Sequence, residues 1–295
     1  MKFSPKRVLL GVLGAFAVWN LNLSPAQAWW ETGHMITAQI AYDNLRPEVR
    51  SRADKLIAWL DNSEPDVGRR HFVPVSVWMD DTKARGLYAF NEWHYINIPY
   101  NPEGLAVTKD ALSTNIVTVV ETMAKTLSNP KASDFEKAFA LRILLHLFGD
   151  IHQPYHAVGR ISHTHPEGDL GGNRTLLAHH DYRNVHAFWD STAALYPEVK
   201  ATQWRDKIPA MSTELQKRFP RDAWSARMGF APMAWAEESY KLAVRYGYKP
   251  LESELNQVEP ASKLTPDYIR EAQQICAERL ALGGYRLAEL LNASL

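Results

Sequence analysis

Several side chains that can bind a metal ion or exchange protons lie within the thirteen residues 144–156. His146 and Asp150 are four residues apart, so on a helix they lie on one face with their Cβ atoms about 6 Å apart. Pro154 cannot continue a helix, which places His156 in the turn that follows. This arrangement suits a transition metal, whereas the alternative is a buried helix with ordinarily hydrogen-bonded polar side chains.

The same four-residue spacing recurs at His186 and Asp190. His34, Asp80 and His94 are further candidates, although Asp80 taken alone also fits a helix cap or a solvated turn. Together these residues exceed the four ligands of a single tetrahedral zinc ion, so the sequence predicts a multinuclear site. Neutral imidazole and carboxylate ligands suit zinc, and a closed structural site with paired cysteines is excluded because Cys276 is the only cysteine.

Helical patterns dominate the segments that must position these side chains. One short strand is expected within residues 92–99, where the pattern alternates with period two, and a glycine-containing loop is expected at 157–174. No repeat, low-complexity segment or break in composition divides the chain, so we expect one mostly helical domain over residues 29–295. The expected helices are 36–45 (with His34 at its head), 47–60, 105–128, 133–151, 183–195, 201–218, 230–246 and 266–292, with a polar loop at 62–70.

Residues 1–28 have the pattern of a secretory signal peptide. Lys2, Lys6 and Arg7 precede an apolar run at 8–18, and small residues at 26 and 28 suit cleavage after Ala28. A membrane anchor is the alternative, but the run is shorter than the roughly 20 residues that a span needs. Export without any possible intrachain disulfide favours a bacterial periplasmic or secreted protein.

The charge balance does not indicate nucleic-acid binding through a basic surface. The formal net charge is +0, and removal of residues 1–28 leaves 30 basic and 33 acidic residues. A phosphate substrate is still compatible with this balance, because bound divalent metal ions would reverse the local charge of an acidic site.

The order of these motifs resembles the S1/P1 nuclease family, the zinc-dependent single-strand nucleases and 3′-nucleotidases, whose scaffold is shared with bacterial zinc phospholipases C. The resemblance covers nearly all of the chain after residue 28, although only the 146–156 motif is specific by itself. The matching residues are Trp29, Gly33-His34, Trp78-x-Asp80-x-x-Lys83, His94-Tyr95, His146-x3-Asp150-x-His152-Gln153-Pro154-x-His156, Gly171-Gly172-Asn173, His186-x3-Asp190, Gly284-Tyr285-Arg286-Leu287-Ala288 and Leu291-Asn292.

The resemblance implies a helical phospholipase C/P1 nuclease-like fold with a cleft that holds three zinc ions. Asp150 would bridge two of them, and the third would need the free amino group of Trp29, so unprocessed protein would be poorly active. The implied ligand groups are Asp80, His94, His146 and Asp150; His156, His186 and Asp190; and the Trp29 amine and carbonyl with His34 and Asp150.

The resemblance also assigns roles around a scissile phosphate. Lys83 would stabilise transition-state charge, Asn173 would hold phosphate or water, and both would act with Asp80 in catalysis. Tyr95 would stack on a base, and Asn97 would contact the base edge where the family often has Asp, which leaves base preference open.

We therefore expect a monomeric enzyme that cleaves single-stranded DNA and RNA to 5′-nucleotides and has no stable protein partner. A zinc phospholipase C is one alternative, although that family usually has Glu at the position of Asp190. A non-catalytic zinc-binding protein is the other, and Lys83 argues against it. The histidines expected not to bind metal are His71, His152, His163, His165, His179 and His180.

Overall fold

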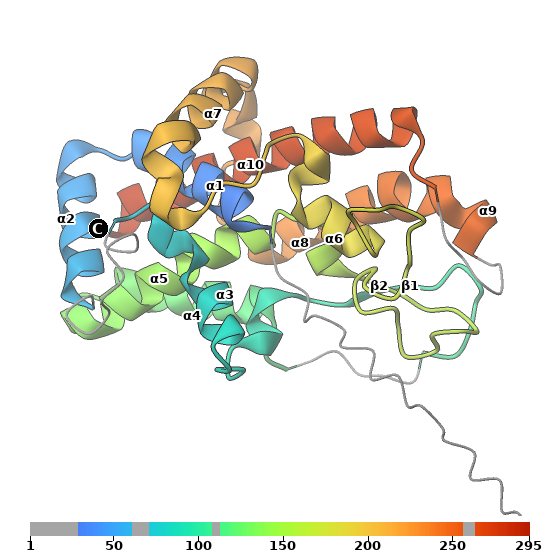
Figure 1. The fold of residues 1–295 in the computed structure, drawn as a ribbon. Coiled ribbons are helices and arrows are strands. Elements are labelled where there is room, and N and C mark those ends of the chain that lie inside the picture. Colours follow the sequence, from blue (N-terminus) through green and yellow to red (C-terminus); the bar gives the residue numbers. More distant parts are fainter. Residues whose placement is uncertain (1–28, 61–70, 108–112, 256–262) are drawn as a thin grey trace, which may run out of the picture.

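Three helices that are mostly buried form the centre of the molecule: α1 (Glu31–Asp43), α5 (Asp134–Asp150) and α10 (Pro266–Ser294). The structure is a computed structural model, and it describes residues 29–60, 71–107, 113–255 and 263–295. In α1 every residue from 32 to 41 is buried, and α1 packs against both α5 and α10 (Figure 1). The mostly helical fold expected from the sequence is confirmed.

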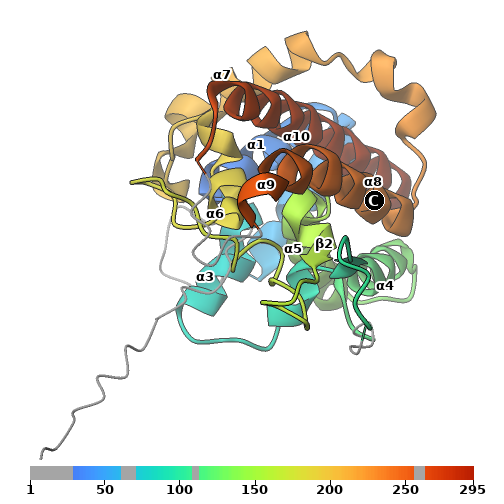
Figure 2. The same cartoon turned by 90° about the vertical axis from the view of Figure 1, so that its right-hand side faces the viewer.

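The other helices cover this centre (Figures 1 and 2). Two of them pack on α5 from the sides, a third packs on α1, and a fourth packs on the turn after α5. In that order these are α2 (Pro47–Trp59), α4 (Ile116–Ser128), α7 (Trp204–Arg218) and α8 (Pro232–Leu242); the short helices are α3 (Trp78–Ala84), α6 (Val185–Asp190) and α9 (Glu252–Leu255). No helix in the described ranges is both long and apolar enough to cross a membrane.

Local sequence signals set the helix starts. Ser133 and Glu136 form a reciprocal capping box at the start of α5, and Pro47 occupies the first turn of α2. The predicted helices over 47–60, 133–151, 201–218 and 266–292 are therefore found within a few residues of their expected bounds.

Two short parallel strands tie the middle of the chain together. β1 (Ile98–Tyr100) pairs with β2 (Val158–Arg160) in the register Ile98↔Val158, and the amide of Ile96 donates to the carbonyl of His156 at 2.8 Å. This pairing fixes the segment after His94 beside the segment after His156. The strand expected at 92–99 is wrong in its first part, because residues 92–94 belong to a 3₁₀ turn (Asn91–His94) and β1 begins only at Ile98.

Four predicted helices differ from the structure. The helix expected over 36–45 begins at Glu31, so His34 lies within it and not at its head. The helix expected from 105 begins at Ile116, because Asn115 caps it and the described residues before it are not helical. The helix expected over 183–195 ends at Asp190, since Thr192, Ala193 and Ala194 take positive φ angles of 53–60°. The helix expected over 230–246 ends at Leu242 and continues as a π-helix (Ala243–Tyr248). The signal peptide and the loop at 62–70 lie outside the described residues.

Candidate metal centre

The histidines and aspartates singled out in the sequence converge between the N-terminal end of α1 and the C-terminal end of α5. They come from α1, α3, α5, α6 and two 3₁₀ turns (Asn91–His94 and Pro154–Ala157). Within each of three groups, one ligand atom per residue lies within 4.8 Å of the others. The groups are His34, His146 and Asp150; Asp80, His94 and His146; and His156, His186 and Asp190.

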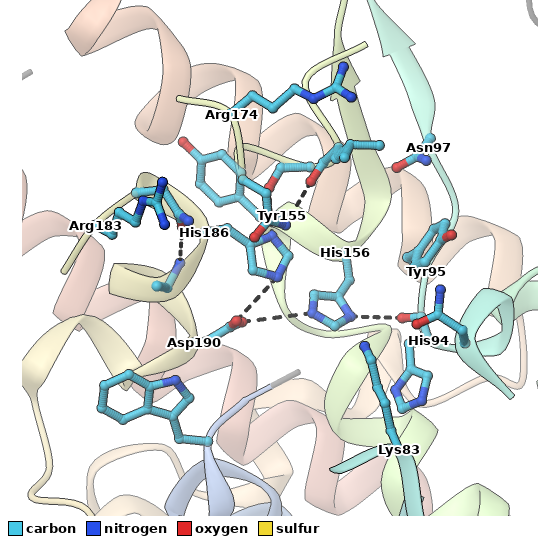
Figure 3. A pocket seen from close by; sticks show the side chains of 17 residues that line it. Lys83, His94, Tyr95, Asn97, Tyr155, His156, Arg174, Arg183, His186 and Asp190 are labelled. Carbon is cyan, nitrogen blue, oxygen red and sulfur yellow. Dashed lines mark hydrogen bonds and ion pairs between the residues drawn. The ribbon is translucent and has the colours of Figure 1, made fainter. Parts of the chain in front are cut away.

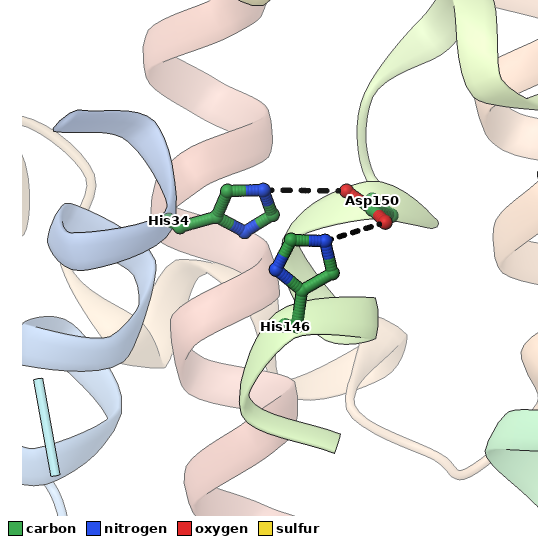
Figure 4. Close-up of side chains that lie close together, drawn as sticks. All are labelled: His34, His146 and Asp150. Carbon is green, nitrogen blue, oxygen red and sulfur yellow. Dashed lines mark ion pairs between the residues drawn. The ribbon is translucent and has the colours of Figure 1, made fainter. Parts of the chain in front are cut away.

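Asp150 lies at the junction of these groups and is fully buried. Its Oδ1 is 3.4 Å from His34 Nε2, and its Oδ2 is 3.2 Å from His146 Nε2 (Figure 4). His94 Nδ1 also lies 3.0 Å from Asp150 Oδ2. One carboxylate therefore faces three imidazoles from three different elements, which a bridging ligand requires.

Backbone carbonyls orient three of the histidines. His146 Nδ1 donates to Ser76 O at 2.7 Å. His156 Nδ1 donates to His94 O at 2.7 Å, and His186 Nδ1 donates to Gly171 O at 2.6 Å (Figure 3). Because a carbonyl can only accept, the proton is on Nδ1, and the lone pair of each neutral ring is on Nε2. Metal-binding histidines are fixed in this way by an acceptor behind the ring.

Several polar atoms that face the centre are buried without any hydrogen-bond partner in the described structure. Such atoms are costly in a protein interior unless something else satisfies them. They are the kinds of donor atom that zinc prefers, so these residues fit a zinc site. The atoms are both ring nitrogens of His34, Nε2 of His156 and His186, and one oxygen each of Asp80 and Asp150.

The charges of the centre are strongly coupled. Burial opposes ionisation of Asp150, but His146 and His156 outweigh it and hold the pKa of Asp150 well below its usual range. Burial likewise lowers the pKa of His146, yet Asp150 and Asp80 reverse this effect and raise it to about 9. The buried carboxylates therefore stay charged and need positive charge beside them. Protonated His146 supplies such a charge, and a bound metal ion would replace its proton.

Gly149 lets α1 approach α5 at the site. A Cβ atom on Gly149 would lie 2.6 Å from His34 Nδ1, and the Gly149 carbonyl accepts from Trp29 Nε1 at 2.7 Å. Any side chain here would displace His34 from the centre. Gly149 was not among the predicted site residues, because its only signal in the sequence is a glycine inside a helical pattern.

The glycines of the 157–174 loop also have a structural function. Gly171 has φ +61°, and a Cβ atom there would lie 2.5 Å from Tyr155 O. The positive φ expected for these glycines is found. The backbone of Gly171 lies close to Tyr155, and the Gly171 carbonyl orients His186.

Gln153 is a second residue to which the sequence analysis gave no role. Its Nε2 donates to Asp190 Oδ1 at 2.5 Å, and its Oε1 accepts from Tyr155 N at 2.5 Å. The side chain is completely buried, so it fixes the Asp190 carboxylate against the two histidines of that group. Its position inside the 146–156 motif was the available signal.

A cavity of about 450 Å³ opens beside the metal centre (Figure 3). Eight of the predicted site residues line this cavity: Lys83, His94, Tyr95, Asn97, His156, Asn173, His186 and Asp190. Trp29, His34, Asp80, His146 and Asp150 lie outside that lining. Burial lowers the pKa of Lys83, while Asp80 and Asp150 favour its charged form. Burial raises the pKa of the Tyr95 hydroxyl, which stays neutral.

The remaining histidines lie away from the three groups. His152 is buried, donates from Nδ1 to Phe148 O at 2.8 Å, and accepts at Nε2 from Arg286 Nη1 at 2.9 Å. Both of its nitrogens are therefore used, and it packs behind α5. His163 is exposed and pairs with Glu103. His179 and His180 form a separate group with Asp181 near the surface.

The chain is similar in sequence to known nucleases. A family model described as S1/P1 Nuclease matches residues 29–295. The chain is 26% identical to Endonuclease 1 of Arabidopsis thaliana, with 98% of this chain and 93% of the relative aligned. It is 22% identical to Nuclease S1 of Aspergillus oryzae over 90% of this chain and 91% of the relative. It is 25% identical to Nuclease P1 of Penicillium citrinum over 55% of this chain and 57% of the relative.

Proposed function

This chain belongs to the S1/P1 nuclease family, and we propose that it hydrolyses single-stranded DNA and RNA to 5′-nucleotides and also acts on 3′-nucleotides. The family and its named endonucleases make it a hydrolase of phosphodiester bonds. The observation that best supports the substrate is that Tyr95, Lys83, His156 and His186 line one and the same cavity.

Three zinc ions are proposed for the three groups of ligands. The first would be held by Asp80, His94, His146 and Asp150. The second would be held by His156, His186 and Asp190, and the third by the amine and carbonyl of Trp29 with His34 and Asp150. When bound, zinc supplies Lewis acidity toward phosphate oxygens and makes water acidic enough to attack near neutral pH.

The remaining side chains bind and orient the substrate. Tyr95 stacks on a base, an interaction worth roughly 1–3 kcal/mol that tolerates any base. Asn97 contacts the base edge and can both donate and accept. Lys83 and Asn173 bind the phosphate and stabilise the charge that develops on it, and Asp80 holds its metal beside them.

We also propose that the protein is exported and that cleavage after Ala28 completes the site. The Trp29 ring is fully buried and anchored to Gly149 O, so a new amino terminus at Trp29 would be held beside His34 and Asp150. The mature enzyme is proposed to be a monomeric domain over residues 29–295, in the bacterial periplasm or secreted.

The direct test is hydrolysis by mature protein that begins at Trp29 and is supplied with zinc. Single-stranded DNA, RNA, a 3′-mononucleotide and phosphatidylcholine would be compared with and without a chelator, with protein that retains residues before Trp29 as a second sample. We expect chelator-sensitive release of 5′-nucleotides, and about three zinc ions per mature chain by elemental analysis.

Other outcomes identify other functions. Turnover of phosphatidylcholine alone would contradict the proposal and indicate a phospholipase C. No turnover of any substrate by a protein that retains three zinc ions would indicate a zinc-binding protein instead.

A further inference from the structure

Two arginines on the rim of the cavity stand out because the rest of the lining contains little charge. Arg174 and Arg183 line the cavity, and the only other charged side chains among the described residues of its lining are Lys83 and Asp190. Asp190 is buried and faces His156 and His186, so it does not neutralise the rim. The chain after residue 28 has more acidic than basic residues, so this local excess of cations does not reflect a generally basic surface.

Both guanidinium groups have hydrogen-bonding capacity left for a ligand. Arg183 is exposed, and within the described residues its side chain has no hydrogen bond or ion pair. Arg174 is exposed as well, and among the residues that the structure describes its side chain donates only to the carbonyl of Gly168, at 3.3 Å. A guanidinium offers five N–H donors in a planar fork that matches phosphate oxygens.

Backbone pairing holds the two arginines in a fixed relation to the metal centre. They lie near the two ends of a ribbon in which Leu176 bridges Asn184, Val185 N donates to Thr175 O, and Leu177 N donates to Arg183 O. The ribbon leads directly into α6, where the Asn184 side chain caps the helix that carries His186 and Asp190. The position of the arginines is therefore set by the same element as the second ligand group.

The two arginines lie away from the residues that bind the base. In Figure 3, Arg183 lies across the cavity from Tyr95 and Asn97, and Arg174 lies at the edge opposite Lys83. A nucleotide with its base on Tyr95 and its phosphate at the ligand groups would leave Arg174 and Arg183 uncovered. The next phosphates of a longer strand can reach it.

We propose that Arg174 and Arg183 form an anion subsite that binds the strand phosphates flanking the scissile one. The subsite rests on the proposed nuclease function, and it makes the enzyme prefer oligonucleotides over mononucleotides and dinucleotides. An oligonucleotide carries phosphates that reach the subsite, whereas a 3′-mononucleotide has only the one at the ligand groups.

The test compares hydrolysis of thymidine 3′-monophosphate, the dinucleotide TpT and hexathymidylate by zinc-loaded mature protein. In the double variant Arg174→Gln/Arg183→Gln, we expect kcat/KM on hexathymidylate to fall by roughly tenfold for each arginine, with little change on the 3′-monophosphate. Because two phosphate contacts are lost, the slope of log kcat/KM against log salt should become shallower by about 1.4.

Two control variants test whether the effect comes from these two arginines and from their charge. Arg245 is exposed, does not line the cavity, and stacks on Tyr246, so Arg245→Gln should leave the length preference and the salt slope unchanged. Arg174→Lys/Arg183→Lys keeps the charge and should retain most of the salt slope.

Three results would overturn the subsite. They are an unchanged length preference in the double Gln variant, an unchanged salt slope, and an equal loss on all three substrates. If the wild type hydrolyses none of them, the proposed function fails, and the subsite is judged by fluorescence anisotropy with labelled hexathymidylate. Equal affinity of the wild type and the double Gln variant would then overturn it.

Discussion

At the scale of single residues, the centre depends on groups that stand behind the proposed ligands. His146, His156 and His186 each donate from Nδ1 to a carbonyl on another segment, and Gln153 holds Asp190. These partners fix which nitrogen or oxygen faces the centre before any metal binds. Residues that touch no substrate can therefore control metal affinity.

We predict that Gly149→Ala weakens metal binding at His34. The added methyl group would overlap the imidazole, and such overpacking costs about 1–3 kcal/mol. Elemental analysis should find less zinc per chain, and the free energy of unfolding should fall by that amount. Gly229→Ala is the matched control, since a Cβ atom there meets nothing within 4 Å. Full zinc content in Gly149→Ala would contradict the prediction.

We predict that Gln153→Ala lowers zinc affinity by about 10–100-fold, as is typical when the partner of a metal ligand is removed. The Asp190 carboxylate would lose the amide that orients it, and Tyr155 N would lose its acceptor. Competition with a chromogenic chelator would measure the affinity. The exposed Gln203 is a suitable control position. An unchanged affinity would show that the histidines alone orient Asp190.

At the scale of elements, a cluster of charges joins α8, α10 and the end of α5. Glu238 of α8 accepts from Arg279 and Arg286 of α10 at 2.7–2.9 Å, and both arginines are buried. Arg286 also donates to His152, and Arg279 donates to the His152 carbonyl, just after the 146–150 ligand pair. The cluster thus anchors the segment on which Asp150 and His156 depend.

Acid should weaken this cluster. Burial opposes ionisation of Glu238, but the hydrogen bonds and charges of Arg286 and Arg279 outweigh it and hold the pKa of Glu238 far below 4.5. Because the pKa is depressed in the folded state, the stabilisation is complete above about pH 4.5 and is lost as the pH falls toward the folded value.

We predict that Glu238→Gln lowers the free energy of unfolding by about 2–4 kcal/mol at pH 7, since it leaves two buried guanidinium groups without their carboxylate. The difference in the free energy of unfolding between wild type and variant should become smaller as the pH falls from 5 to 3. Urea unfolding of both proteins in chelator would measure this without a contribution from metal release. Glu289→Gln breaks a half-exposed pair with Arg221 and should cost less than about 1 kcal/mol. A gap that stays constant with pH would contradict the assignment.

At the scale of the whole molecule, the proposed metal ions would cross-link segments that are distant in sequence. The ligand groups join residues from 34 to 190, drawn from four helices and two turns. Asp150 and Asp190 are buried, and Asp80 is only 13% exposed, so these carboxylates need cations beside them. Bound metal is therefore expected to contribute to stability as well as to catalysis.

We predict that chelation lowers the melting temperature by about 5–10 °C. Zinc at 100 times its Kd stabilises a protein by about 2.7 kcal/mol, and for a chain of this size each kcal/mol shifts the melting temperature by about 2–4 °C. Differential scanning calorimetry with chelator, and again after zinc or magnesium is added back, would measure the shift. Zinc should restore the melting temperature and magnesium should not, because imidazole ligands suit zinc. Identical curves throughout would contradict a metal-stabilised fold.

The sequence by itself determined the helical class and the residues of the centre. The i, i+4 pairs His146–Asp150 and His186–Asp190, with Pro154 after the first, have local geometry that follows from helix periodicity alone. The helices that begin at Ser133 and Pro47 were predictable because their capping signals act within a few residues.

Only the tertiary structure decided how these pieces meet. The parallel pairing of β1 with β2, the overlap that Gly149 avoids with His34, and the turn of left-handed residues after Asp190 all depend on contacts between segments far apart in the chain. The same is true of the rim that Arg174 and Arg183 share, since periodicity describes one element at a time. A single sequence specifies which groups can do the chemistry, whereas packing between elements decides which of them face one another.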